Sequence, residues 1–284
     1  MTGAPSWLVL AAVILIYVIY TQFFSPAPES TVVDGNAEIS IIDVGQGDAI
    51  LIKTASEAVL IDAGPGSSKN TLREYLTSRG VETIDYAIFT HPHEDHIGGA
   101  AMVMNDFAVK NVILPDVVHT SATFENMIDV IEKSGAEVHQ ALYGTQYDIG
   151  GIRLTILAPI SEEYSDLNDY SVAVRIDFGE TSFMFTGDAE ALVESQMLAK
   201  YSPAMLDCDF MKAAHHGSST SNTREFLEAV SPDIVAISSE KGNSYGHPHK
   251  EVIADLNDMG VDIYRTDTMG TLVFITDGKE IKAK

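Results

Sequence analysis

The chain has 284 residues and a formal net charge of −24 at pH 7, and its hydrophobic fraction of 45% is ordinary for a globular protein. This length allows one large α/β domain or two small ones. The acidic charge repels nucleic acid and counts against a processive DNA-binding enzyme, although divalent ions and a few lysines can form a local positive site. The single cysteine, Cys208, rules out an intrachain disulfide and so does not identify the compartment.

The N-terminal part of the chain differs in composition from the rest. Residues 7–24 carry no charged side chain, and an apolar helix of about eighteen residues just spans the hydrocarbon core of a bilayer. We therefore predict a transmembrane segment or signal anchor over residues 1–24 and a Pro- and Ser-containing linker over residues 25–36. A catalytic domain over residues 37–284 would then be membrane-anchored outside the cytoplasm. A cleaved signal is the alternative, in which case the protein is secreted.

After the linker, the pattern of the chain predicts a mixed α/β domain. A strand meander is expected over residues 38–44, 49–53 and 58–61. Further strands are expected near Ile84, Val112, Val138, Leu154, Val172, Phe183, Phe210, Ile234, Ile263 and Leu272. Helices are expected over residues 69–79, 123–134, 189–200, 221–229 and 248–259. The order of strands and helices roughly repeats, which predicts two similar α/β halves that face one another.

One short loop is unusually rich in metal ligands. His91, His93, Asp95 and His96 follow the strand near Ile84 and precede a predicted helix start. Imidazole and carboxylate groups bind zinc, manganese and iron. The two alternating histidines could face one ion while the adjacent Asp95 and His96 face another. The loop therefore predicts a site for two divalent metal ions.

Later strand ends supply further ligand candidates. Asp188 follows an apolar strand at a Gly-Asp pair, from which a carboxylate can project into a cleft and bridge two ions. His247 precedes Pro248, which is expected to fix the turn and begin a helix. His249 would lie in the first turn of that helix. His247 is therefore the better ligand candidate of the two.

These residues together resemble the metallo-β-lactamase superfamily. Its pattern of an Asp after a strand, a His-x-His-x-Asp-His run, a later Asp and a distant His is similar to Asp62, residues 91–96, Asp188 and His247. Residues 41–49, 215–218 and 245–249 resemble the hydrolase domain of ComEC-type DNA-uptake proteins. The resemblance covers about residues 37–278 and implies a four-layer αβ/βα sandwich with the metals at one edge, between two sheets. It extends to the hydrolase domain and not to the DNA channel.

The sequence departs from the superfamily pattern at one ligand. A further His usually lies between the main motif and the late Asp, but no His lies between His139 and His215. Asn168 or Asp169 could substitute for it. An oxygen ligand at that place would make manganese more suitable relative to zinc, because harder ions prefer oxygen.

Other polar residues are expected beside the metals rather than on them. Asp62 is expected to hold the histidine loop by hydrogen bonds. Gln46 and Asp48 are expected to shape the cleft floor, although their Gly-x-Gly turn could merely connect two strands. Lys212 could supply cationic support or could be a solvated strand end.

The resemblance implies a hydrolytic mechanism. Two ions would lower the pKa of a bridging water until a metal-bound hydroxide forms, and Asp95 or Asp188 would orient it. His215, His216 and Ser218 would hold phosphate oxygens or protonate the leaving group. The alternative for the two histidines is packing at a strand end.

We therefore expect a metal-dependent phosphodiesterase or nuclease that acts on DNA or nucleotides, with zinc or manganese as its ions. The DNA-uptake machinery is the expected partner. A hydrolase of a lactam, lactone or thioester is the second hypothesis, since the same hydroxide could attack those bonds. A binding or scaffold module is the third, and the nearly complete ligand set counts against it.

Overall fold

The computed structural model describes residue 32 and residues 35–284. The predicted membrane segment and most of the predicted linker lie outside these residues. No helix in the described part of the chain is long and apolar enough to cross a membrane.

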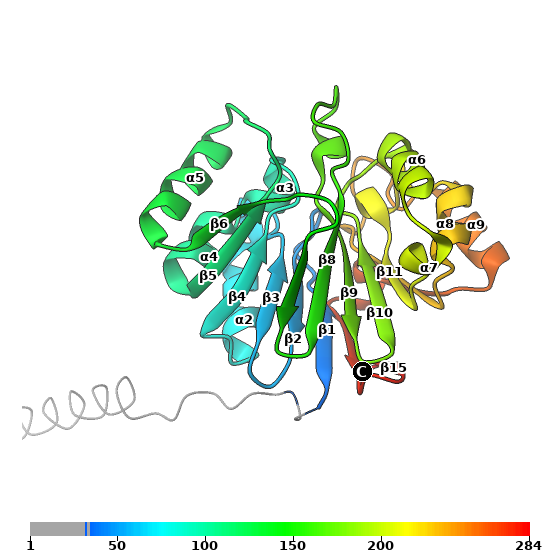
Figure 1. Cartoon of the computed structure of the whole chain (residues 1–284), viewed down its shortest axis with the longest axis horizontal. Helices are drawn as coiled ribbons and strands as arrows, with labels where there is room; N and C mark the ends of the chain where they lie inside the picture. Colours follow the sequence, from blue (N-terminus) through cyan, green and yellow to red (C-terminus); the bar gives the residue numbers. More distant parts are fainter. Residues whose placement is uncertain (1–31, 33–34) are drawn as a thin grey trace, which may run out of the picture.

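Two β-sheets form the centre of the domain (Figure 1). The first sheet has eight strands, in the spatial order β15 (Ile281–Ala283), β14 (Leu272–Thr276), β1 (Ala37–Ile41), β2 (Ile50–Lys53), β3 (Ala58–Ile61), β4 (Thr83–Ile88), β5 (Ala108–Leu114) and β6 (Glu137–Gln140). The second sheet has seven, in the order β13 (Asp262–Arg265), β12 (Ile234–Ile237), β11 (Phe210–Lys212), β10 (Thr181–Phe185), β9 (Ala173–Phe178), β8 (Ile152–Ala158) and β7 (Gln146–Ile149).

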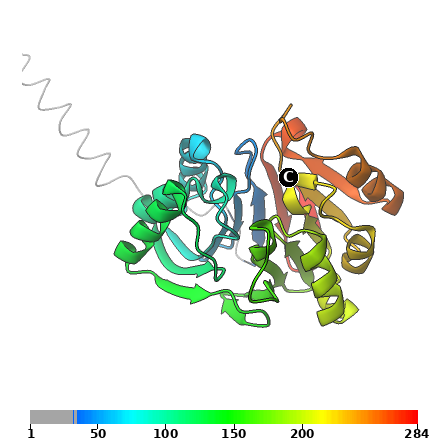
Figure 2. The same cartoon turned by 90° about the horizontal axis from the view of Figure 1, so that it is seen from above.

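Helices cover the outer face of each sheet, as the view from above shows (Figure 2). The first half carries α2 (Lys69–Ser78), α3 (Glu94–Ile97), α4 (Ala100–Asp106) and α5 (Ala122–Ser134). The second half carries α6 (Ala191–Lys200), α7 (Pro203–Leu206), α8 (Arg224–Val230), α9 (Lys250–Met259) and the short α10 (Thr266–Met269). Three short 3-10 helices are η1 (Gly66–Ser68), η2 (Asn168–Tyr170) and η3 (Ala214–Gly217). The predicted arrangement of two sheets between helical layers is confirmed.

Three apolar cores hold these layers together. The central core lies between the sheets and includes Ile39, Ile52, Phe183 and Phe210. The other two join each sheet to its own helices. Strands β1, β2, β3 and β10 are buried along their whole length. Burial on both faces explains why β2 and β3 are nearly continuous apolar runs.

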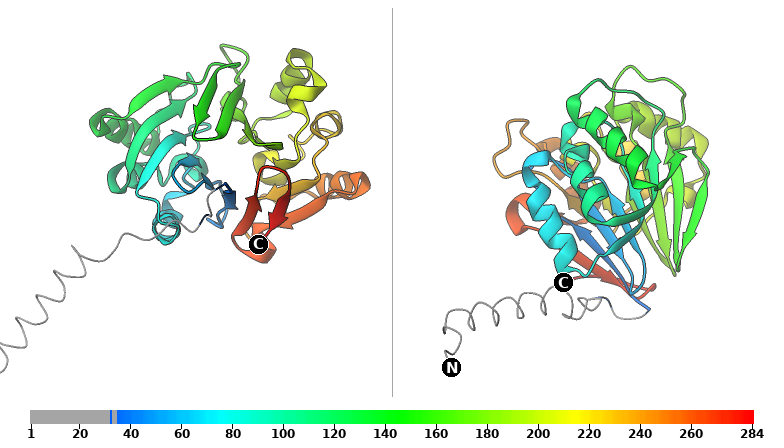
Figure 3. Two further views of the ribbon diagram at one scale, coloured as in Figure 1. Left: turned by 60° about the horizontal axis from the view of Figure 1, so that its bottom comes forward. Right: turned by 90° about the vertical axis from the view of Figure 1, so that its left-hand side faces the viewer.

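The two halves share a pattern of strand pairing. In each sheet an antiparallel meander is followed by parallel strands, namely β3 to β6 in the first sheet and β10 to β13 in the second. The last strands return to the first sheet, where β14 pairs with β1 (Figure 3). The pairing is antiparallel and places Phe274 opposite Ile39. Strands β7 and β15 were not predicted. Both are short and lie at sheet edges.

This topology decides where polar loops meet. The carboxyl ends of parallel strands lie at one edge of a sheet, and connecting loops at that edge form ligand sites. The loops after β4, β10, β11 and β12 all begin at such ends. The loop between β1 and β2 joins them, since Asp48 N donates to Asp95 O at 3.2 Å.

Candidate metal centre

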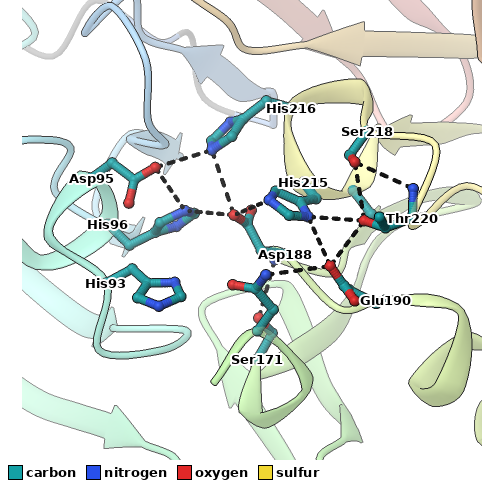
Figure 4. Close-up of polar contacts among 12 residues, drawn as sticks. His93, Asp95, His96, Ser171, Asp188, Glu190, His215, His216, Ser218 and Thr220 are labelled. Carbon is teal, nitrogen blue, oxygen red and sulfur yellow. Dashed lines mark hydrogen bonds and ion pairs between the residues drawn. The ribbon is translucent and has the colours of Figure 1, made fainter. Parts of the chain in front are cut away.

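Four side chains that could hold a metal ion converge at this edge. One ligand atom each from Asp95, His96, Asp188 and His216 lies within 4.8 Å of the others. Asp188 Oδ2 lies 3.2 Å from His96 Nε2 and 3.5 Å from His216 Nε2 (Figure 4). Asp95 Oδ2 lies 3.4 Å from His216 Nε2. We call these four residues the ligand cluster.

The ligand cluster fits a divalent ion. His96 Nε2, His216 Nε2 and Asp188 Oδ1 are buried and form no hydrogen bond with any residue that the structure describes. Buried polar atoms normally have a partner, because leaving them unpaired costs free energy. Two imidazole nitrogens and a carboxylate oxygen around one point are ligands that zinc, manganese and iron accept.

Asp62 holds His96 in place from the neighbouring strand. Its carboxylate accepts hydrogen bonds from Thr90 N at 2.8 Å, Thr90 Oγ1 at 2.7 Å and His96 Nδ1 at 2.7 Å. A bond to one ring nitrogen fixes the tautomer and directs the other nitrogen toward the metal. Asp62 has a φ of 58°, a left-handed conformation that Asp tolerates better than most residues.

His91 and His93 lie beside the ligand cluster and outside it. His91 is buried, and its Nε2 lies 3.0 Å from His93 Nδ1 and 4.0 Å from Asp188 Oδ2. Ser171 Oγ lies 3.3 Å from His91 Nδ1 and accepts a hydrogen bond from Asp188 N at 3.1 Å. His91 therefore lies between Asp188 and His93.

The loop after β11 presents its two histidines in an unusual backbone conformation. His215 and His216 have φ values of 48° and 55°, which most side chains avoid. His215 Nε2 lies 3.7 Å from Asp188 Oδ2, while its Nδ1 lies 3.3 Å from Glu190 Oε1. The sequence predicted that these histidines would hold phosphate oxygens or protonate the leaving group. The structure places His216 within the ligand cluster itself.

A buried ion pair supports this loop from the opposite sheet. Lys212 Nζ donates to the Asp48 carboxylate, and both side chains are almost completely buried. Asp48 Oδ1 also lies 3.4 Å from His216 Nδ1, which is 3.1 Å from Ser238 O. Burial opposes ionisation of Asp48, but the charge of Lys212 lowers its pKa to about 2. Lys212 is therefore not a solvated strand end.

The charges within the centre shift several pKa values strongly. Burial lowers the pKa of His91 well below its usual range. Burial also disfavours the charged form of His96, but the Asp188 and Asp62 carboxylates raise its pKa well above normal. Burial likewise disfavours the charged form of His216, but the Asp188 and Asp48 carboxylates raise its pKa to about 9. A divalent ion bound here would displace the extra protons of His96 and His216, because imidazole binds metals in its neutral form.

The ligand cluster opens into a pocket of about 280 Å³, which we call the metal pocket. Polar and aromatic residues line it: Gln46, His93, Glu94, Asp95, Asn168, Asp188, His215, His216, Tyr245 and His247. The buried Oδ1 of Asn168 forms no hydrogen bond within the described residues. Asp169 instead accepts a hydrogen bond from Glu190 N at 3.2 Å. Of the two residues expected to replace the missing histidine, only Asn168 lines the metal pocket.

Other predicted residues lie at the edge of this pocket. The His247 ring centroid is 5.5 Å from that of His215. His249 precedes α9 in an extended conformation instead of lying in its first turn, and its Nδ1 accepts from Ser219 N at 2.9 Å. Ser218 Oγ contacts Thr220 Oγ1 at 3.0 Å and does not line the pocket.

Glu190 is a candidate site residue that was not predicted from the sequence. Its Oε1 accepts hydrogen bonds from Thr220 Oγ1 at 2.9 Å and Asn168 Nδ2 at 3.4 Å, beside the contact with His215 (Figure 4). A second carboxylate two residues after Asp188, at the same strand end, was the available signal. Glu190 connects Asn168 on one side of the pocket with His215 on the other.

Comparison with known proteins agrees with this geometry. The model of the metallo-β-lactamase superfamily matches residues 42–239. ComE operon protein 3 of Bacillus subtilis (strain 168) is 27% identical over 255 residues, which cover 84% of this chain and 33% of that protein. Competence protein ComA of Neisseria gonorrhoeae is 29% identical over 263 residues, which cover 92% of this chain and 35% of that protein. The chain thus spans about a third of the length of these relatives.

Solved structures show the same fold. YhfI of Bacillus subtilis, a metallo-β-lactamase fold protein, matches with a TM-score of 0.56 at 12% identity, over 84% of this chain and 100% of that one. Igni18, a metallo hydrolase of Ignicoccus hospitalis, matches with a TM-score of 0.55 at 18% identity, over 84% and 98%. The predicted resemblance to ComEC-type competence proteins is confirmed by the two relatives above. The chain belongs to the metallo-β-lactamase superfamily and has the fold of its metal-dependent hydrolases.

Proposed function

We propose that the protein is a metal-dependent phosphodiesterase or nuclease that acts on DNA or nucleotides. The observation that carries this proposal is the metal pocket, in which carboxylate and imidazole groups converge and no aliphatic side chain takes part in the lining. Pockets for apolar acyl groups are mostly lined by hydrophobic side chains. The polar lining therefore favours a phosphodiester over a lactam, lactone or thioester. The competence relatives favour DNA or a nucleotide as the molecule that carries the diester.

Two groups of residues would hold the ions. Asp95, His96, Asp188 and His216 would bind one ion. His91, His93, Asn168 and the shared Asp188 would bind a second, with His247 available at the rim. Bound zinc or manganese supplies Lewis acidity toward a phosphoryl oxygen and activates a water. The oxygen ligand of Asn168 makes manganese well suited to the second position.

The side chains of the pocket orient and protonate the substrate. Glu190 and Thr220 face His215 Nδ1, so Nε2 points toward Asp188 and the open pocket. From that position His215 donates a proton to the leaving oxygen of the diester. Ser218 supports His215 indirectly, through Thr220, because Ser218 Oγ accepts a hydrogen bond from Thr220 N at 3.2 Å.

We also propose that the domain works at a membrane, outside the cytoplasm and beside DNA-uptake machinery. The uncharged run over residues 7–24 supports an anchor. The competence relatives support the partner. If residues 1–24 are cleaved, the same domain would be secreted.

The test is metal-dependent turnover by the full chain. Single-stranded DNA and bis(p-nitrophenyl) phosphate are offered with manganese or zinc, and His93→Ala and Asp95→Ala serve as controls. We expect two bound ions per chain and diester cleavage that chelation and both substitutions abolish. Two bound ions without cleavage of any diester would instead support a hydrolase of a non-phosphate bond. A chain that binds no metal would support the scaffold hypothesis.

A further inference from the structure

We propose that a second pocket beside the metal pocket is the subsite for the nucleoside next to the scissile phosphate, with Tyr245 as its stacking residue. The inference rests on the proposed phosphodiesterase function. The second pocket measures about 580 Å³ and shares Gln46, Glu94, Asp95 and Tyr245 with the metal pocket. We call it the side pocket. A diester held at the ligand cluster therefore has room for one of its two ester groups in the side pocket.

Tyr245 has the geometry of a platform for a base. Its ring stacks on His247 with centroids 5.6 Å apart and an angle of 22° between the planes. The residue is nevertheless 67% exposed, so most of its surface is open to solvent. Nucleobases stack on exposed aromatic rings of this kind in single-stranded nucleic acid sites.

The loop that carries Tyr245 is held firmly despite its exposure. Asn243 Oδ1 accepts hydrogen bonds from Tyr245 N at 3.1 Å and His247 N at 3.0 Å. Asn243 Nδ2 donates to Glu240 O at 2.9 Å, and Glu240 N donates to Gln46 Oε1 at 3.2 Å. A ring fixed in this way binds a flat ligand with little loss of conformational freedom. The loop thus presents the Tyr245 ring at the boundary of the two pockets.

The charge of the side pocket limits what can occupy it. Apart from Asp95, which would bind metal, its ionisable lining residues are Tyr245 and the carboxylates of Asp43, Glu94 and Glu240, and none of the residues that line it is Lys, Arg or His. Carboxylates repel a phosphate but accept hydrogen bonds from sugar hydroxyls. Ser67, Ser68 and Thr71 add neutral polar groups. The side pocket therefore suits a nucleoside that carries no further phosphate.

The experiment uses the full chain with manganese and the diester thymidylyl-thymidine. Tyr245→Ala is expected to raise KM by about 5- to 150-fold, which corresponds to the loss of one stacked base. Tyr245→Phe keeps the ring and is expected to stay within about twofold of the wild type. Tyr143→Ala removes an exposed aromatic residue that packs on Lys200, outside both pockets. That control is expected to change nothing.

Two abasic analogues separate stacking from a structural role. Each lacks the base on one side of the phosphate. For one analogue, Tyr245→Ala and the wild type are expected to give equal KM values, because the stacked base is already missing. Equal loss of activity toward all three diesters, or no loss toward any, would overturn the proposal.

A terminal phosphate tests the charge argument. Adding it on the side whose base stacks on Tyr245 is expected to raise KM, and Glu240→Gln is expected to recover about two- to threefold of that rise at low salt. An unchanged KM would show that the side pocket accepts a nucleotide that carries a further phosphate, as in a polynucleotide, and would contradict the charge argument.

A binding measurement distinguishes failure of the subsite from failure of the proposed function. If the wild type cleaves no diester, calorimetric titration with thymidine 5′-monophosphate still tests the subsite. Weaker binding to Tyr245→Ala than to Tyr245→Phe would then support it, and equal binding would overturn it.

Discussion

The loop after β4 and the loop after β11 both bring histidines to the same centre, but different contacts hold them there. In the first loop, His96 lies on the short helix α3 and is held by Asp62, which directly follows strand β3. In the second loop, His215 and His216 take left-handed backbone conformations. Asp48 supports this loop from the other sheet, 164 residues away from Lys212 in the sequence. The contact that orients His96 thus comes from its own half, whereas the Asp48 carboxylate reaches the second loop from the other half.

The largest effect is expected where the two loops meet, at Asp188. Its Oδ2 lies near His96, His215 and His216. Asp188→Asn removes the charge that both loops share and is expected to lower kcat/KM by about a thousandfold. Metal content by elemental analysis should fall with it. Asp129→Asn, an exposed residue of α5, is the matched control. Full metal content and activity in Asp188→Asn would contradict a shared ligand.

Lys212→Met tests the second loop alone. It leaves the Asp48 carboxylate buried and unpaired, which typically costs about 3–5 kcal/mol of unfolding free energy. Urea unfolding of the metal-free chain measures this loss. Because the two groups interact, the double variant Lys212→Met, Asp48→Asn is expected to regain part of it. Strictly additive losses would show that the pair does not support the loop.

Asp62→Asn tests the first loop alone. The substitution keeps the shape of the side chain but removes the carboxylate that accepts from His96 Nδ1. Loss of such a partner typically weakens metal binding about 10- to 100-fold. Competition with a chelator measures the affinity, and Asp85→Asn, which lies in the same half on β4, controls for loss of charge. Unchanged affinity would assign His96 a smaller role than its position implies.

Glu190→Gln is expected to have the smallest effect. It weakens the contact that orients His215 while leaving the ligand cluster intact. We expect kcat to fall about tenfold with metal content unchanged, since a positioned general acid contributes about 10²–10⁴-fold in total. Glu162→Gln, an exposed residue elsewhere, is the control. A fall in metal content would place Glu190 among the residues that hold the ions.

The same contrast explains what the sequence could predict. The ligands of the first loop follow one another within six residues, so their convergence can be read from local spacing alone. Apolar runs likewise predicted most strands. Strands β7 and β15 were not predicted because they are short edge strands with partly exposed side chains.

The arrangement of the second loop could not be predicted from local spacing. Lys212 remained ambiguous because its partner Asp48 lies in the other half of the chain. The choice between Asn168 and Asp169 depends on the conformation of η2. There Asn168 lines the metal pocket, whereas the neighbouring Asp169 accepts a hydrogen bond from Glu190 N. The place of His216 in the ligand cluster depends on a left-handed backbone conformation. The residue types at these positions do not predict that conformation.

The most direct test of the account is whether His216 binds metal. The full chain, loaded with cobalt(II), is compared with His216→Ala by visible absorption and by the number of ions bound. We predict that the substitution changes the cobalt spectrum and weakens or removes one ion, while His249→Ala, outside the ligand cluster, does neither. An identical spectrum and stoichiometry in His216→Ala would contradict the place of His216 in the ligand cluster.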